Sequence, residues 1–371
     1  MIKAKQLFFV LLNLLIGVGV FVSCNNGKVH TEHTNTISYD VKFPKDIVLE
    51  GEGMVMGDIL MRYPYRIAQL GRYLFLLDFH AELDFCHVID TVGWHEVALF
   101  APRGNGPDET LQAMNLQVIS LDSIWVYDTN KREAVRWSFE KELHTKDTIL
   151  ISERVRMKEN MLTSANCVVC GGTNFFVTDP SGRNRIVRCN GEGEIIERIG
   201  TIPTIHKQDE ESNGVLAQAW NSFIDYNSDS GILAVVTQLG DVIEIYDRKN
   251  DMRHLLYGSY GEPEYKTTRD GYAVPVGIMG YSDVKVTGNY IYALFHGRSF
   301  KDIAKDPLNT PDGGEYIHVY THDGTPVCRL VLDHAVYGIH VNEEEGIIWA
   351  TDVNTEEQIV KYHLPELNLN K

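Results

Sequence analysis

Cys24 is the residue whose position most directly indicates a chemical reaction, because it follows an apolar run near the N-terminus. Two lysines precede residues 7–22, which are too short for a membrane span but suit a cleaved export signal. Cleavage after the small residue Ser23 would leave the Cys24 thiol free to carry a lipid. The sequence thus predicts a lipoprotein signal peptide at residues 1–23 and lipidation of Cys24. An ordinary signal peptide cut elsewhere, or an uncleaved anchor, is the alternative.

The other cysteines number five once Cys24 is assigned to lipid, and an odd count argues against a complete disulfide framework. Cys167 and Cys170 have the spacing of a redox pair, but such pairs use a helix N-terminus to lower the thiol pKa. The flanking residues indicate a strand instead, in which residues three apart point to opposite faces. We therefore expect buried thiols.

The glycine-rich segment Arg103–Glu109 invites comparison with a phosphate-binding loop. It lacks the following helix of a dinucleotide site and the Lys-Ser or Lys-Thr pair of a P-loop. We expect a turn in which Gly104 and Gly106 adopt unusual backbone angles, with a ligand-facing loop as the alternative. The chain also contains no Gly-x-Ser-x-Gly elbow and no His-Glu-x-x-His motif, so nucleophilic and zinc catalysis are not indicated.

A repeated unit dominates the remainder of the chain: a turn, an apolar strand and a polar break. Its spacing of about 50 to 60 residues suits a propeller blade of four strands. The copies lie at residues 71–78, 121–128, 172–179, 230–236, 288–294 and 346–352.

These repeats predict an all-β fold, a six-bladed propeller with four-stranded antiparallel blades over residues 41–371. Residues 24–40 are polar and without apolar periodicity, so we expect a flexible tether there. A ring must hide its seam, and residues 42–50 are predicted to supply the outer strand of the last blade. The segment His296–Gly314 interrupts the fifth blade and is expected to cover a ligand or face a partner.

One polar residue from each predicted innermost strand is a candidate for lining the channel and binding a ligand. Such side chains could bind sugar hydroxyls or a divalent cation such as calcium, and an arginine among them could bind a carboxylate. Any water-filled channel also favours polar residues, and the set contains a single acidic residue, so no cofactor is expected. The candidates are Arg66, Asn115, Asn166, Asn221, Asp283 and His340.

The six units, together with Arg103–Glu109 after the first blade, resemble the TolB-like six-bladed propeller lipoproteins of Bacteroidetes. Members of that family often carry a Gly-x-Gly-Pro-Gly-Glu-type segment there, and Asp108 replaces its third glycine in this chain. The resemblance spans about residues 41 to 365. It implies a propeller in the cell envelope and supplies no established reaction.

The net charge of −17 opposes binding to nucleic acid or to an anionic membrane surface, so membrane attachment would depend on the lipid. No acidic run follows Cys24, which favours a periplasm-facing anchor over the cell surface. We expect a non-catalytic binding or scaffolding module for an envelope protein, a carbohydrate or a peptide. A metal-dependent propeller hydrolase, lactonase or lyase acting at the channel mouth is the alternative.

Overall fold

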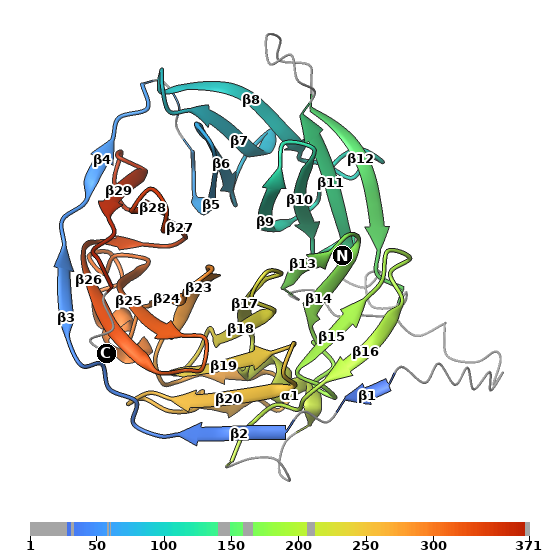
Figure 1. Cartoon of the computed structure of the whole chain (residues 1–371), viewed down its shortest axis with the longest axis vertical. Coiled ribbons are helices and arrows are strands. Elements are labelled where there is room, and N and C mark those ends of the chain that lie inside the picture. The colour runs from blue at the N-terminus through green and yellow to red at the C-terminus, as the bar shows by residue number, and fades with distance from the viewer. Residues whose placement is uncertain are drawn as a thin grey trace, which may run out of the picture.

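The computed structural model describes residues 28–30, 33–57, 59, 61–139, 149–158, 166–205 and 212–367. These residues form six blades arranged in a ring (Figure 1). In each blade the strands follow one another outward from the central axis in an antiparallel sheet. The predicted all-β, six-bladed propeller is therefore confirmed. The predicted signal peptide and Cys24 lie outside the described residues.

Most blade strands are consecutive along the chain. From the first blade to the sixth, and from the axis outward, they are β5 (Pro64–Leu70), β6 (Tyr73–Asp78), β7 (Asp84–Asp90), β8 (His95–Pro102); β9 (Ala113–Ser120), β10 (Ser123–Asp128), β11 (Glu133–Phe139), β12 (Ile149–Arg156); β13 (Cys167–Gly171), β14 (Asn174–Thr178), β15 (Ile186–Cys189), β16 (Ile195–Ile199); β17 (Ser222–Asn227), β18 (Ile232–Thr237), β19 (Val242–Asp247), β20 (Met252–Tyr257); β23 (Tyr281–Val286), β24 (Tyr290–Phe295), β25 (Gly314–Thr321), β26 (Pro326–Val336); β27 (Ile339–Asn342), β28 (Ile347–Thr351) and β29 (Ile359–His363).

The second strand of each blade coincides with one of the six sequence copies. These strands, β6, β10, β14, β18, β24 and β28, are almost entirely buried because each lies inside a sheet that neighbouring blades cover. Glycines at positive φ form the turn before several of them, as at Gly71 and Gly231. The repeat thus marks the most buried strand of every blade.

An N-terminal strap, formed by strands β1 to β4, runs around the outside of four successive blades (Figure 1). β1 (Lys28–His30), β2 (His33–Ser38) and β3 (Asp46–Leu49) add parallel fifth strands to blades three, four and five. β4 (Glu52–Met54) pairs antiparallel with β29 and is the fourth strand of blade six. The ring is therefore closed by an N-terminal strand, as predicted.

The predicted position of that closing strand is wrong by one blade. Residues 42–50 include β3, which pairs with β26 of blade five, and the closing strand is β4. The physical reason is the order of the chain: the strand nearest in sequence to β5 must complete blade six, because the chain passes from there to the centre of blade one. The predicted flexible tether is also partly wrong, since β1 and β2 attach residues 28–30 and 33–38 to the ring.

Short helices and a hairpin extend from one end of the blades. α1 (Asn213–Ala219) lies between β16 and β17, and the hairpin of β21 (Tyr265–Thr267) and β22 (Ala273–Pro275) lies between β20 and β23. α2 (Phe300–Lys305) lies within the predicted insertion of the fifth blade. The part of the chain that the structure describes contains no helix long and apolar enough to cross a membrane.

The hydrophobic core lies between the faces of adjacent blades. Trp125 of blade two meets Phe175 of blade three edge to face, with 5.1 Å between ring centroids. Trp349 is likewise buried. Trp220, just before β17, is only 1% exposed and also belongs to the core.

Candidate functional site

The innermost strands bring four of the six predicted ligand-binding residues to the central axis. Arg66 on β5, Asn115 on β9 and Asp283 on β23 line a first channel cavity of about 30 Å³. His340 on β27 lines a second channel cavity of about 180 Å³, which shares several of its residues with the first. The predicted convergence therefore occurs for these four side chains, around very little open space.

Arg66 is buried and held by aromatic and polar neighbours. Its guanidinium lies 3.8 Å from the centroid of the Tyr65 ring and 4.9 Å from that of Phe223. Nη1 donates to the Tyr65 carbonyl at 2.9 Å, and Nε is 4.0 Å from Asp283 Oδ1. The arginine thus faces a carboxylate that the protein itself supplies.

Asp283 accepts three hydrogen bonds from within the fold. Its Oδ1 accepts from the Val284 amide at 2.9 Å and from Lys285 Nζ at 3.2 Å. Its Oδ2 accepts from the Ile339 amide of blade six at 2.9 Å. Because amides and cations surround this carboxylate, it links blades five and six rather than standing ready for a metal ion.

The sequence prediction missed several channel residues, among them Gln117, Asp225 and Lys285. Gln117 and Lys285 lie two positions beyond the candidates Asn115 and Asp283, so they point to the same face of the same strands. Asp225 Oδ2 accepts from the Val286 amide at 2.7 Å, which ties blade four to blade five. A polar side chain with period two in an innermost strand was the signal that could have identified them.

Burial shifts the pKa values of two channel residues, Asp225 and His340. It raises the pKa of Asp225 above its ordinary value, although the Lys285 ammonium opposes the shift. Burial, assisted by the same ammonium, lowers the pKa of His340 to about 4. His340 is therefore neutral at physiological pH, and the charged groups of the channel are two cations, Arg66 and Lys285, facing two acidic residues.

Asn166 and Asn221 do not reach the two channel cavities. Asn166 precedes β13, is buried, and donates through Nδ2 to the Ser222 carbonyl of blade four at 2.7 Å. Asn221 precedes β17 and donates to Gln238 Oε1 at 2.7 Å, in a separate cavity beneath α1. Both residues come before the strand itself, so they lie at the end of the blade rather than along the axis.

No group of three or more His, Cys, Asp or Glu side chains among the described residues is arranged to hold a metal ion. Cys167 and Cys170 are free thiols, and burial raises the pKa of Cys167 and takes that of Cys170 to about 11. Thiols with raised pKa values are poor nucleophiles, so this pair has the character of core residues.

The glycine-rich segment after blade one is a turn, as predicted, but its glycines do not adopt the predicted unusual backbone angles. Neither Gly104 nor Gly106 has a positive φ. A Cβ at Gly104 would lie 2.0 Å from Glu109 Oε2, and the Gly106 amide donates to that same oxygen at 2.6 Å. Lys131 Nζ then donates to the Gly106 and Glu109 carbonyls at 2.7 and 2.6 Å. The glycines permit close approach of the Glu109 carboxylate, which closes the turn.

Three larger cavities involve the loops at the end of the blades that carries α1, α2 and the hairpin. We call this end the loop face. The cavity beneath α1 has about 480 Å³, the cavity beside α2 about 510 Å³, and the cavity beneath the strap about 500 Å³. α2, within the insertion His296–Gly314, lies beside one of these cavities, and the role of the insertion in covering a ligand or facing a partner stays a prediction.

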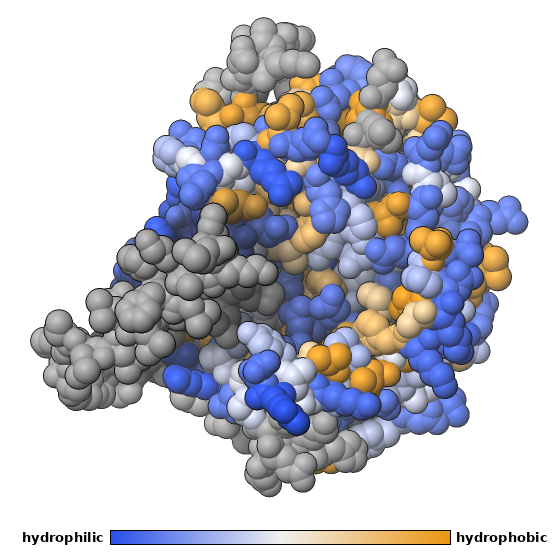
Figure 2. Space-filling model, turned by 180° about the vertical axis from the view of Figure 1, so that it is seen from behind, coloured by the Kyte–Doolittle hydropathy of each residue, from blue (hydrophilic) through white to orange (hydrophobic). Residues whose placement is uncertain are grey.

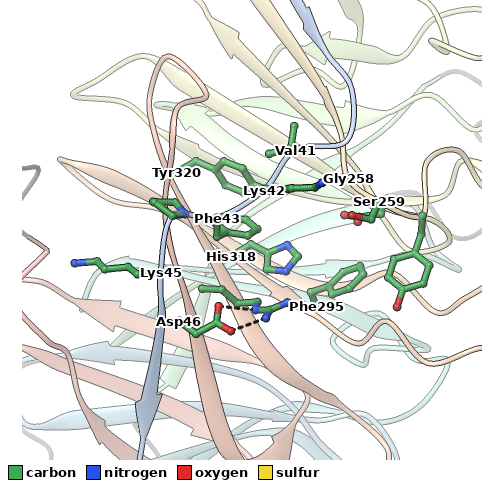
Figure 3. A pocket seen from close by; sticks show the side chains of 14 residues that line it. Val41, Lys42, Phe43, Lys45, Asp46, Gly258, Ser259, Phe295, His318 and Tyr320 are labelled. Carbon is green, nitrogen blue, oxygen red and sulfur yellow. Dashed lines mark hydrogen bonds and ion pairs between the residues drawn. The ribbon is translucent and has the colours of Figure 1, made fainter.

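The strap cavity lies between blades four and five, with residues 41–46 as one wall. The ring of His318 lies between Phe43 and Phe295, with centroid distances of 4.5 and 4.6 Å (Figure 3). His318 Nδ1 is 3.1 Å from the Tyr281 hydroxyl, which donates to Asp241 Oδ1 at 2.8 Å. The Arg329 guanidinium in this cavity forms a bidentate ion pair with the Asp46 carboxylate. The Asp46–Arg329 pair thus attaches the strap, and the Tyr281–Asp241 bond joins blades four and five.

The face opposite to that of Figure 1 is predominantly hydrophilic (Figure 2). On the face opposite to that of Figure 1, hydrophobic residues lie in small groups among hydrophilic ones (Figure 2). This agrees with the net charge of −17 and directs attention to the cavities rather than to an apolar patch on that face.

Solved structures similar to this chain share its fold at low sequence identity. A member of the DUF4221 family from Bacteroides vulgatus has 12% identity and a TM-score of 0.53, with 85% of this chain and 97% of that chain covered. A protein of Bacteroides fragilis described as exported has 10% identity and a TM-score of 0.52, with 91% and 100% covered. The WD40 repeats of RRP9 have 8% identity and a TM-score of 0.50, with 85% and 100% covered. A search among curated proteins found no match.

The family model described as TolB-like 6-blade propeller-like matches residues 42–344. The match covers the strap from Lys42 onward and runs into blade six, in agreement with the ring of blades in the structure. The chain belongs to the TolB-like six-bladed propeller family.

Proposed function

We propose that this protein is a lipid-anchored, extracytoplasmic binding module that holds its ligand at the loop face and carries out no reaction. The two channel cavities measure about 30 and 180 Å³, whereas each loop-face cavity measures about 480 to 510 Å³. Sites for small ligands usually enclose roughly 300 to 1,000 Å³. This difference in size is the observation on which the proposal rests.

The pairing of the channel charges supports the same proposal. Arg66, Asp225, Asp283 and Lys285 bind one another or the backbone of a neighbouring blade. Removing one partner of a buried pair is costly, so these groups are suited to holding blades together. Because these four charged groups are engaged by the protein, a hydrolase or lyase at the channel mouth would have to use another group, such as the neutral His340.

Metal analysis tests the absence of a catalytic ion. We expect the full chain to contain no stoichiometric divalent metal by mass spectrometry, and its melting temperature to be unchanged by EDTA. An ion present at one per chain, and lost in Asp283→Asn, would contradict the proposal and favour the metal-dependent alternative.

The proposed cellular location is argued from the sequence, since the predicted signal peptide and Cys24 precede the described residues. The apolar run before Ser23-Cys24 supports export, and the similar Bacteroides fragilis protein is described as exported. The acidic charge leaves the lipid as the means of attachment. The absence of an acidic run after Cys24 supports a periplasm-facing position in the cell envelope.

Labelling cells with an alkynyl fatty acid tests the anchor. We expect the wild type to carry the label and to sediment with membranes, and Cys24→Ala to lose both properties. Cys328→Ala, which changes a buried cysteine, serves as the matched control and should keep the label. Retention of the label by Cys24→Ala would disprove lipidation at this residue. Ready cleavage of the protein by protease added to intact cells would instead place it on the cell surface.

A further inference from the structure

We infer that the cavity beneath α1 binds a neutral saccharide. The inference rests on the proposed binding function and names the class of ligand for one of its sites. This cavity, here the α1 cavity, lies where blades three and four meet and is lined from above by residues of α1 and by Tyr272 of the hairpin loop. Its volume of about 480 Å³ is within the usual range for small ligands.

The charged side chains of the α1 cavity are occupied by the protein. Arg185 donates to Glu244, to the Trp220 carbonyl and to Ser222 Oγ, and all three contacts are buried. Burial alone would raise the pKa of Glu244, but Arg185 and Arg253 outweigh it and hold that pKa below its ordinary value. The guanidinium is thus neutralised within the core and is not free to bind an anion.

Asp179 is equally occupied. Its Oδ1 accepts from the Ser181 amide at 2.9 Å, and its Oδ2 accepts from the Asn184 amide and side chain, each at 3.0 Å. These bonds form the loop after β14. With both charges engaged, the groups available to a ligand in this cavity are uncharged.

The central available groups are the side-chain amides of Asn221 and Gln238. Asn221 Nδ2 donates to Gln238 Oε1 at 2.7 Å, which leaves Asn221 Oδ1 as an acceptor and Gln238 Nε2 as a donor. If both amides are turned over, the bond reverses and one acceptor and one donor still remain. A pair of neighbouring sugar hydroxyls matches this arrangement, because each hydroxyl can both donate and accept.

Gln218 and Tyr272 complete the lining. Gln218 Oε1 accepts from the Ala273 amide at 3.1 Å, which attaches the hairpin to α1 and leaves the Gln218 NH₂ group as a further donor. Tyr272, in the adjoining hairpin turn, is 60% exposed and offers an aromatic ring and a hydroxyl at the rim. An exposed ring beside uncharged amides suits a ligand with an apolar C–H face and a polar edge, as in a pyranose.

Calorimetric titration tests the inference. The full chain, purified in a detergent without a sugar headgroup, is titrated with glucose, galactose, mannose, N-acetylglucosamine, cellobiose and lactose, and with glucuronate and triglycine for comparison. We expect saturable binding of at least one neutral sugar. Tyr272→Ala should weaken that binding about tenfold through loss of ring and hydroxyl contacts. Tyr260→Ala removes a tyrosine of similar exposure, 53%, that lines the other two loop-face cavities, and should change the affinity less than about twofold.

Failure to bind any neutral sugar, or equal binding by wild type and Tyr272→Ala, would overturn the inference. Binding of triglycine or glucuronate that depends on Tyr272 would also overturn it, while the proposed loop-face binding function would stand. Mass spectrometry of the recovered sugar separates the other case: conversion to a product would contradict the proposed non-catalytic function. Matching circular dichroism spectra of the variants show that each is folded.

Discussion

At the scale of single residues, the polar groups of this propeller are used chiefly to join parts of the chain. The aspartate that ends a second strand is an example, because it recurs in several blades. Asp78 accepts from the Arg62, Tyr63 and His80 amides at 2.9 to 3.1 Å, and Asp128 accepts from the Leu111, Asn130 and Lys131 amides at 2.6 to 3.0 Å. Each carboxylate thus fixes both loops at the end of its strand.

Asp78→Ala should therefore lower the free energy of unfolding by about 2–3 kcal/mol, because three amides lose a charged acceptor. Urea denaturation measures the change. Asp270→Ala, at an exposed hairpin position, is the matched control and should change stability by less than about 0.5 kcal/mol. Equal stability of the two variants would show that the strand-end aspartate is dispensable.

The buried His318 should make the stability of the protein depend on pH. Burial between Phe43 and Phe295, with a lesser effect of Arg329, lowers its pKa to about 3, below the ordinary value of 6.5. Between these values the unfolded chain binds the proton and the folded chain does not, so stability falls as pH decreases from about 6.5 towards 3. His318→Phe keeps the ring and leaves the Tyr281 hydroxyl bonded to Asp241.

The loss of unfolding free energy between pH 7 and pH 5 should be about 2 kcal/mol smaller in His318→Phe than in the wild type. Urea denaturation at the two pH values gives this difference directly. The exposed His363, replaced in His363→Phe, should leave the difference as in the wild type. An unchanged pH dependence in His318→Phe would mean that His318 binds a proton as readily in the folded protein as in the unfolded chain.

At the scale of elements, the strap does more than close the ring, because it also adds an outer strand to three other blades. Three of its strands run parallel to the outer strands of blades three to five, and β4 completes blade six. The strap begins close in sequence to the predicted lipid anchor. Force on the anchor would therefore act first on the outermost strands and reach the closing strand last.

Two neighbouring positions on β3 show whether the strap stabilises the ring. Leu49 is 7% exposed and packs against blades five and six, whereas Val48 is 71% exposed. Leu49→Ala should lower the free energy of unfolding by about 2–3 kcal/mol through the cavity it leaves, and Val48→Ala should change it by less than about 0.5 kcal/mol. Urea denaturation compares them, and a similar small effect for both would mean that the strap contributes little to stability.

The sequence predicted the strands themselves better than it predicted which strands and side chains lie next to one another. The six second strands were recognisable because burial on both faces leaves a continuous apolar run. The closing strand was assigned to the wrong blade because strand pairing depends on the path of the chain around the ring. Asp225 and Lys285 were missed because a single candidate was taken from each blade, although side chains two apart share a face. Asn221 lies before its strand, and its association with Gln238 depends on a loop of the same blade that no periodicity predicts.

At the scale of the whole molecule, the proposed function assigns structural support to the axis of the ring and ligand binding to the loop face. The axis is filled by paired charges and offers cavities of about 30 and 180 Å³, and the loop face offers the larger ones. Because Arg185 and Asp179 are engaged within the protein, an uncharged ligand is the chemistry that the α1 cavity suits best. In the proposed function, the propeller is a rigid frame for binding sites built from loops and short elements.

The most direct test of this separation is the affinity of the tightest-binding neutral sugar for two variants, one in each region. Gln238→Leu removes an amide of the α1 cavity, and His340→Gln changes a side chain of the second channel cavity. Calorimetry should show an affinity at least about tenfold weaker for Gln238→Leu and unchanged for His340→Gln. Weaker binding by His340→Gln, with wild-type binding by Gln238→Leu, would place the ligand in the channel and contradict the account.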